Sequence, residues 1–296
     1  MSTPEPRSTR ALVLAGAGAA GNAWELGLVA GLAAAGVDLT AADLVVGTSA
    51  GSTVAAQITS GTRPADLYAA VLAETSPAGP RPTRAPTASA QSFMDWSDTI
   101  IAASADPAEM RRRMGAAALE KDTPDDTGTT RWRETVAARL PRHDWPAQLV
   151  RIAAVDARTG EPVVFDRDSG IDLVDAVAAS TSNGFAGTYR IGERRLINGG
   201  YRRNENADLA AGYARVLVLS PFSGRTRHPL AWGMDLATQV DELRAGGSTV
   251  EVVVPDASAG DVFNASAMDP STRPQAARGG YDQGRAVAEG LAAIWG

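Results

Sequence analysis

Ser49 is the residue of this sequence whose surroundings best fit a nucleophile. It lies at the centre of GTSAG, a match to the pattern G-x-S-x-G, between an apolar segment at residues 43–46 and a segment with helical spacing at residues 52–60. A sharp strand-to-helix turn of this kind lifts the serine hydroxyl out of the sheet and places it at a helix N-terminus, where a developing negative charge is favoured. Gly47 and Gly51 suit the crowded backbone of such a turn. The alternative is an ordinary strand–helix connection in which the serine caps the helix.

A second candidate is the glycine-rich segment GAGAAG at residues 16–21, which follows an apolar run. The N–H groups of Gly16, Ala17 and Gly18 could form an oxyanion hole that faces Ser49 across neighbouring strand ends. The same pattern is formally a dinucleotide-binding fingerprint, but the serine turn stands where the acidic ribose-binding residue is expected. A turn that packs a helix on the sheet is the third interpretation.

A serine nucleophile needs a base, and the chain has only two histidines, His143 and His228. Both lie in polar loop segments and are expected on the surface. The remaining candidate is Asn198, which follows the strand-like segment RRLI and precedes Gly199 and Gly200. An amide, however, cannot accept the serine proton as a carboxylate would.

The composition is that of an ordinary globular protein and excludes several kinds of chemistry. The chain has 296 residues, 44% of them apolar and 21% charged, and no cysteine, which excludes thiolate catalysis and cysteine-ligated metal sites. A formal net charge of −6 argues against a general attraction to nucleic acid. We expect no nucleic-acid partner and, because no export signal or membrane-spanning segment is visible, a cytoplasmic location. The sequence leaves the oligomeric state open.

Alternating apolar and helical segments predict an α/β fold in which helices cover a parallel sheet. Residues 1–10 are predicted to be a disordered lead-in to a single domain at residues 11–296. A helical cap is expected at about residues 77–145, beginning with a proline-rich loop at residues 77–90. The predicted strands are residues 11–15, 43–46, 149–155, 162–165, 215–219 and 250–254. The predicted helices include residues 23–35, 93–104, 108–120, 131–140, 171–179, 230–244 and 283–295.

The ordered motifs GAGAAG, GTSAG and NGG, with their spacing and strand contexts, resemble those of the patatin-like phospholipase family. The resemblance extends from residue 11 to about residue 219 and is least distinctive over the cap. It implies a three-layer α/β/α sandwich with a mostly parallel sheet, and a lipid acyl hydrolase or esterase that acts on acyl-ester or lipid substrates. It further implies transient contact with a membrane or micelle, and a serine–aspartate dyad that needs no metal and no cofactor. In such a protein, Ser49 attacks the ester carbonyl and residue 198 takes its proton.

The sequence departs from this family in two places. Ala17 and Ala20 stand where the glycine loop has a glycine and a basic residue, which leaves the backbone donors intact. Asn198 occupies the position of the dyad aspartate, and loss of an orienting aspartate in serine proteases lowers the rate about 10⁴-fold. We therefore expect this form to be inactive or strongly impaired.

Three hypotheses account for Asn198. The first is a deliberate replacement of aspartate. The second is a natural residue, either of a pseudoenzyme or of an enzyme that uses Glu205 or Asp208 as the base instead. The third is a residue that regains a carboxylate by deamidation next to Gly199. The alternative function is a non-catalytic lipid- or acyl-binding protein, followed by a nucleotide-binding protein.

Overall fold

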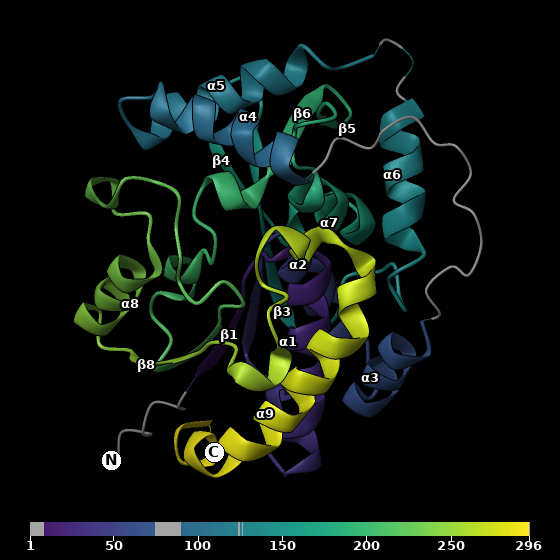
Figure 1. The fold of residues 1–296 in the computed structure, drawn as a ribbon, viewed down its shortest axis with the longest axis vertical. Coiled ribbons are helices and arrows are strands. Elements are labelled where there is room, and N and C mark those ends of the chain that lie inside the picture. The colour runs from purple at the N-terminus through teal and green to yellow at the C-terminus, as the bar shows by residue number, and fades with distance from the viewer. Residues whose placement is uncertain (1–8, 75–89, 124, 126, 296) are drawn as a thin grey trace, which may run out of the picture.

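The computed structural model describes residues 9–74, 90–123, 125 and 127–295, which are arranged around a central sheet (Figure 1). The strands are β1 (Arg10–Leu14), β2 (Leu44–Gly47), β3 (Leu149–Asp156), β4 (Pro162–Phe165), β5 (Tyr189–Ile191), β6 (Arg194–Asn198), β7 (Arg215–Leu219) and β8 (Thr249–Val253). In the described residues the sheet has the order β5-β6-β3-β2-β1-β7-β8, and β4 pairs with β3 outside this order. The five strands from β3 to β8 in this order are parallel, whereas β4, β5 and β6 join by antiparallel pairing.

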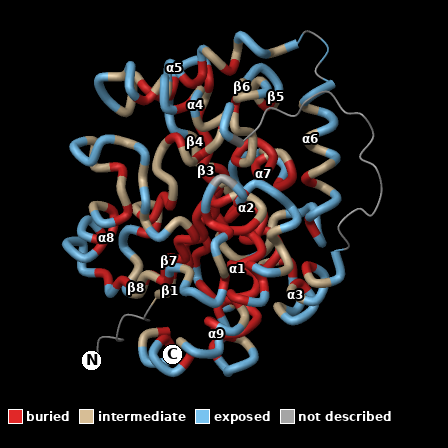
Figure 2. Tube along the Cα trace, in the orientation of Figure 1, coloured by how far each residue is buried: buried red, intermediate tan, exposed pale blue. Residues whose placement is uncertain are grey.

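Helices cover both faces of the sheet. They are α1 (Gly18–Ala34), α2 (Ala50–Ile58), α3 (Pro64–Ala73), α4 (Ala90–Ala102), α5 (Pro107–Leu119), α6 (Thr127–Ala137), α7 (Leu173–Thr181), α8 (Leu236–Ala245) and α9 (Arg273–Trp295). Along β1, Leu12 and Leu14 pack into one core with α1, α2, α7 and α9, whereas Ala11 and Val13 pack into a second core with α8. Successive side chains of a strand point to opposite faces, so an almost wholly apolar strand must be covered on both. Figure 2 shows the buried chain concentrated at this centre. The prediction of a three-layer α/β/α fold with a mostly parallel sheet is confirmed.

Strand β3 brings the ends of β2 and β6 together. β2 pairs with β3 up to Gly47, opposite Ile152, and β6 pairs with β3 down to Asn198, opposite Ala154. Because β4 occupies the other edge of β3 over this stretch, β2 and β6 must share one edge. The two strands run towards each other along that edge, and the segments that follow them therefore meet.

α4 and α5, from the region predicted to form a helical cap, lie near the end of the sheet to which β5 and β6 belong (Figure 1). Met110 and Met114 of α5 form one apolar cluster with Val155 and Ile197 of the underlying strands. A Cβ on Gly115 would lie 2.0 Å from the Ala157 carbonyl oxygen, so the helix packs directly on the backbone that follows β3. The predicted proline-rich loop at residues 77–90 lies outside the described residues, apart from Ala90 at the start of α4.

Several element boundaries differ from the predicted ones. β1 begins at Arg10, one residue before the predicted start of that strand. α1 begins at Gly18, inside the glycine-rich segment rather than after it. Ala17, with φ of −155° and ψ of 40°, and Gly18, with φ of +60°, lie outside the helical region, and the residues from Ala19 onward continue the helix.

The last two predicted helices also change. The helix predicted at residues 230–244 is divided at Gly233, whose φ of +61° ends a short 3₁₀ turn, and α8 starts afresh after Asp235 caps it. α9 begins at Arg273 rather than at residue 283. A Cβ on Gly280 would lie 2.2 Å from the Trp24 carbonyl oxygen, so glycines that weaken a helix in isolation are here required for its contact with α1. Among the described helices, none is both long and apolar enough to cross a bilayer.

Candidate active site

The turn between β2 and α2 holds Ser49 in an unusual backbone conformation. Its φ of 51° and ψ of −121° lie outside the regions that L-residues favour, and its side chain is half-buried. A Cβ on Gly47 would lie 2.6 Å from the Ser52 Cα, and a Cβ on Gly51 would lie 2.1 Å from the Leu14 carbonyl oxygen. Both glycines are therefore required where the helix turns back onto the sheet.

Ser49 and Asn198 lie side by side. The Asn198 Nδ2 donates to the Ser49 Oγ over 2.9 Å, and the Asn198 Oδ1 accepts from the Gly200 N–H over 2.8 Å. A backbone N–H can only donate, so the Gly200 N–H fixes the amide oxygen on its own side and turns the NH₂ group towards Ser49. Gly199 cannot carry a side chain, because a Cβ would lie 2.2 Å from the Ala153 carbonyl oxygen. Asn198 thus gives Ser49 a hydrogen-bond donor where a base would give an acceptor.

The glycine loop borders Ser49 at the N-terminus of α1. A Cβ on Gly16 would lie 2.9 Å from the Ser49 Cβ. The Gly16 N–H donates to the Asn204 carbonyl oxygen over 3.4 Å, whereas the N–H groups of Ala17 and Gly18 have no acceptor among the described residues. Of the three predicted oxyanion donors, the N–H groups of Ala17 and Gly18 therefore have no acceptor among the described residues, whereas that of Gly16 already has one.

Two polar side chains that the sequence analysis did not single out hold this arrangement. The Ser49 N–H donates to the Ser180 Oγ of α7 over 2.9 Å. The fully buried Asn206 donates from Nδ2 to the Thr48 Oγ1 over 2.9 Å and to the Gly199 carbonyl oxygen over 3.2 Å. Asn206 thus connects Thr48, which precedes Ser49, to Gly199, which follows Asn198. The Asn-Glu-Asn segment at residues 204–206, which follows NGG after three intervening residues, was the available signal.

Glu205 and Asp208, the two alternative bases suggested by the sequence, bond to other residues and not to Ser49. Glu205 is buried, which raises its pKa, and its carboxylate accepts from the Ser220 hydroxyl over 3.0 Å and from the Gln239 amide over 3.3 Å. Asp208 is ion-paired with Arg202; burial acts against ionisation there, but the hydrogen bonds from Arg202 keep the pKa of Asp208 below its usual value. The hypothesis that either of them replaces the base at position 198 has no support in these contacts.

The histidines are also engaged elsewhere. His143 is exposed and contacts the Ala137 carbonyl oxygen. His228 is half-buried, bonds to the Thr226 hydroxyl and stacks on Trp232, which corrects its expected surface position. Burial, with a further effect of the neighbouring Arg227, lowers the pKa of His228 to about 4. Neither ring contacts Ser49.

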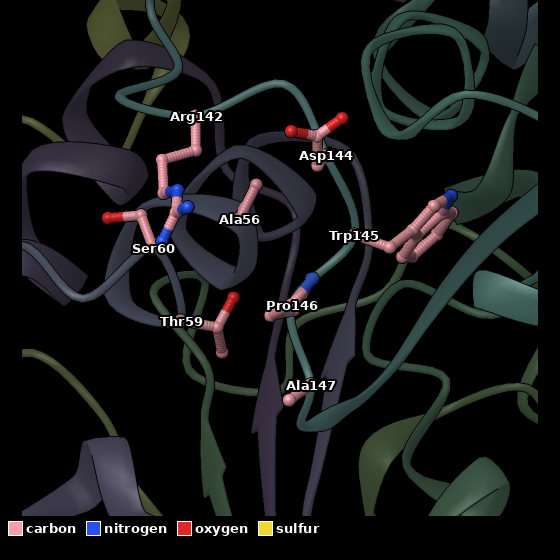
Figure 3. A pocket seen from close by; sticks show the side chains of 8 residues that line it. All are labelled: Ala56, Thr59, Ser60, Arg142, Asp144, Trp145, Pro146 and Ala147. Atoms are coloured by element: carbon pink, nitrogen blue, oxygen red, sulfur yellow. The ribbon is translucent and has the colours of Figure 1, made fainter.

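A hollow of about 180 Å³ lies apart from this site, beside the C-terminal end of α2 (Figure 3). Ser60 and Arg142 are among its lining residues, and neither Ser49 nor Asn198 is. In the described part of the chain, no group of three or more histidine, cysteine or acidic residues could hold a metal ion.

Comparison with known proteins identifies one matching family and similar solved structures. A family model described as patatin-like phospholipase matches residues 12–211. Among solved structures, VipD from Legionella pneumophila aligns with 14% identity over 96% of this chain and 67% of its own, with a TM-score of 0.46. The type III effector protein ExoU aligns with 17% identity over 96% of this chain and 53% of its own, with a TM-score of 0.45. A search of curated proteins found no match. With two thirds of its residues matched by the family model, the chain belongs to the patatin-like phospholipase family.

Proposed function

We propose that this chain carries the site of a serine-dependent lipid acyl hydrolase in which an amide replaces the base, so that hydrolysis is strongly slowed. The observation that carries the proposal is the 2.9 Å contact between the Ser49 Oγ and the Asn198 Nδ2, next to the N-termini of α1 and α2. Family membership supports the reaction class, and the contact supports the two residues.

In the active form, the Ser49 Oγ attacks the ester carbonyl carbon while a carboxylate at position 198 takes the hydroxyl proton. The N–H groups of Ala17 and Gly18 receive the oxyanion, and the partial positive charge at the start of α1 adds to their effect. The C–O bond then breaks, the alcohol leaves with the proton, and water hydrolyses the acyl-serine. With Asn198 in place, the first step lacks its proton acceptor.

An apolar side chain lies beside the glycine loop. A Cβ on Gly18 would lie 2.6 Å from the Sδ of Met268, so this methionine borders the proposed oxyanion donors. Met268 is itself 53% exposed, which places an apolar side chain in solvent beside the proposed site. A single exposed apolar side chain is ordinary on a protein surface, so the proposed lipid substrate rests on membership of the family.

A second function is a lipid- or acyl-binding protein without turnover. The orientation of the Asn198 amide favours it, because a donor at the Ser49 Oγ stabilises a resting hydroxyl rather than activating it.

A fluorophosphonate probe tests the proposal, because the reaction requires an activated serine and an oxyanion hole but no substrate recognition. We expect rapid labelling of Ser49 in the Asn198→Asp variant, slow labelling of the unchanged chain, and none in the Ser49→Ala/Asn198→Asp double variant, with the modified peptide assigned by mass spectrometry. A folded Asn198→Asp protein that binds fatty acid and resists the probe would instead support the binding protein.

A further inference from the structure

A hollow of about 240 Å³ lies between α5, β4 and the loop that precedes α8, and most of its charged lining residues are basic. Three guanidinium groups line it, from Arg111, Arg202 and Arg203, against one carboxylate, that of Asp208. Trp232 and Met234 add an apolar wall. Pockets for drug-sized ligands exceed about 300 Å³, so this hollow suits an ion or a small head group.

The three arginines differ in how far their charge is already neutralised. Arg202 donates to both carboxylate oxygens of Asp208, and Arg203 donates to both oxygens of Glu242. Arg111 donates from Nε to the Gly160 carbonyl oxygen over 2.8 Å and forms no ion pair within the described part of the chain. Its four terminal N–H donors therefore remain for a ligand.

The charges around Arg111 favour an added anion. Burial is the main cause that lowers the pKa of Arg111, and the positive charges of Arg202 and Arg112 act in the same direction against the opposing effects of Glu161 and Asp106. Neither of these carboxylates comes within ion-pair distance of Arg111 among the described contacts, and Glu161 is exposed. A half-buried guanidinium close to a second one is stabilised when an anion binds between them.

We propose that this hollow binds a phosphate group. It is held by the terminal N–H groups of Arg111 of α5 and by those donors of Arg202, in the loop that follows Asn198, that do not bond to Asp208 or Asn206. A guanidinium presents parallel donors that match phosphate oxygens, and two such groups on different elements suit a tetrahedral anion better than a planar carboxylate. The wall of Trp232 and Met234 accommodates the carbon skeleton to which the phosphate is attached.

The hollow is connected to the candidate active site through one hydrogen-bonded chain. The Arg202 Nη1 donates to the Asn206 Oδ1 over 2.7 Å, and Asn206 in turn donates to Thr48 and to the backbone of Gly199. A ligand on Arg202 therefore binds next to Asn206, which connects the segment of Thr48 to the segment of Gly199. Phosphate binding requires no turnover, so this inference is tested independently of the proposed hydrolase activity.

The test is calorimetric titration of the unchanged chain and of the Arg111→Met variant with inorganic phosphate and with glycerol 3-phosphate at constant ionic strength. Arg113→Met is the matched control, because Arg113 lies on the same helix and pairs with Glu109 instead of lining the hollow. We expect at least a tenfold loss of affinity in Arg111→Met and less than a twofold change in Arg113→Met.

A second arm identifies the source of the phosphate. Co-sedimentation with phosphatidylcholine vesicles, with and without phosphatidic acid, is measured for the same three proteins. Arg111-dependent binding of the soluble phosphates assigns a soluble ligand, and Arg111-dependent binding of phosphatidic acid vesicles alone assigns a lipid head group. If neither ligand binds, or if Arg111→Met and Arg113→Met lose affinity equally, the proposal is wrong.

Discussion

Replacing Asn198 by aspartate is the change whose effect follows most directly from the structure. The new carboxylate keeps one oxygen on the Gly200 N–H, now as a charge-assisted bond, and places the other where Nδ2 lies, 2.9 Å from the Ser49 Oγ. The hydrogen bond at Ser49 reverses, because the hydroxyl now donates its proton to the residue that will take it. The side chains are nearly isosteric, so we expect a change of less than about 1 kcal/mol in the free energy of unfolding.

The size of the gain follows from the role of the group. Loss of an orienting aspartate costs about 10⁴ in rate in serine proteases, and each tenfold step corresponds to about 1.4 kcal/mol of barrier. No other base contacts Ser49 among the described residues, so we expect kcat/KM to rise by about 10³ to 10⁴, or about 4 to 5.5 kcal/mol of transition-state stabilisation.

The assay is hydrolysis of a chromogenic acyl-ester series of increasing chain length and of a fluorogenic phospholipid, with Ser49→Ala/Asn198→Asp as the background control. Thermal unfolding of each variant checks that the fold is retained. Equal rates for the unchanged chain and a folded Asn198→Asp variant, on every substrate, would refute the reasoning. Activity that survives in the double variant would show that Ser49 is not the nucleophile.

Three further predictions concern stability and protonation. Gly51→Ala places a methyl group 2.1 Å from the Leu14 carbonyl oxygen, so urea denaturation should show a loss of about 3 kcal/mol or more, and a loss below about 1 kcal/mol would contradict the packing. Glu25 is fully buried, and its carboxylate oxygens have no hydrogen-bond partner among the described residues. Burial raises the pKa of Glu25 well above the usual value, although the nearby Ala15 backbone acts in the opposite direction. The folded protein therefore loses stability as the pH rises from the usual carboxyl pKa towards the raised one. Glu25→Met should remove this loss and raise the free energy of unfolding by about 1–3 kcal/mol at pH 8. A variant that is less stable than the unchanged chain at pH 8 would refute the prediction. For His228, burial lowers the pKa to about 4 from 6.5, so stability should be complete above pH 6.5 and decline as the pH falls towards 4, and an NMR titration midpoint near 6.5 would contradict this.

The deamidation hypothesis for Asn198 also receives a physical answer. Ring closure requires the Gly199 nitrogen to approach the side-chain carbonyl carbon of Asn198. In the folded chain the Asn198 amide is held at both ends, and Gly199 is packed against Ala153. The folded state therefore opposes the rearrangement, and a carboxylate at position 198 is not expected to form there spontaneously.

The sequence alone was sufficient for the local chemistry and the class of fold. Runs of apolar residues predicted the buried strands β1, β2 and β7 to within a residue, because a strand covered on both faces needs apolar side chains at every position. The glycines of GTSAG identified the turn around Ser49, because such a turn leaves no space for side chains at Gly47 and Gly51. The order of the three motifs indicated the family.

Only the tertiary structure decided how these parts meet. That β2 and β6 run towards each other along one edge of β3 depends on pairings between segments 105 residues apart (β2 with β3) and 44 residues apart (β3 with β6), which no local pattern encodes. The same pairings placed Asn206 between Thr48 and Gly199, and the Gly200 N–H determined which end of the Asn198 amide faces Ser49. The residue type determines whether a side chain can donate or accept a hydrogen bond, whereas long-range packing determines its partner. In this chain, that packing places the hydroxyl of Ser49 against a donor, the amide of Asn198.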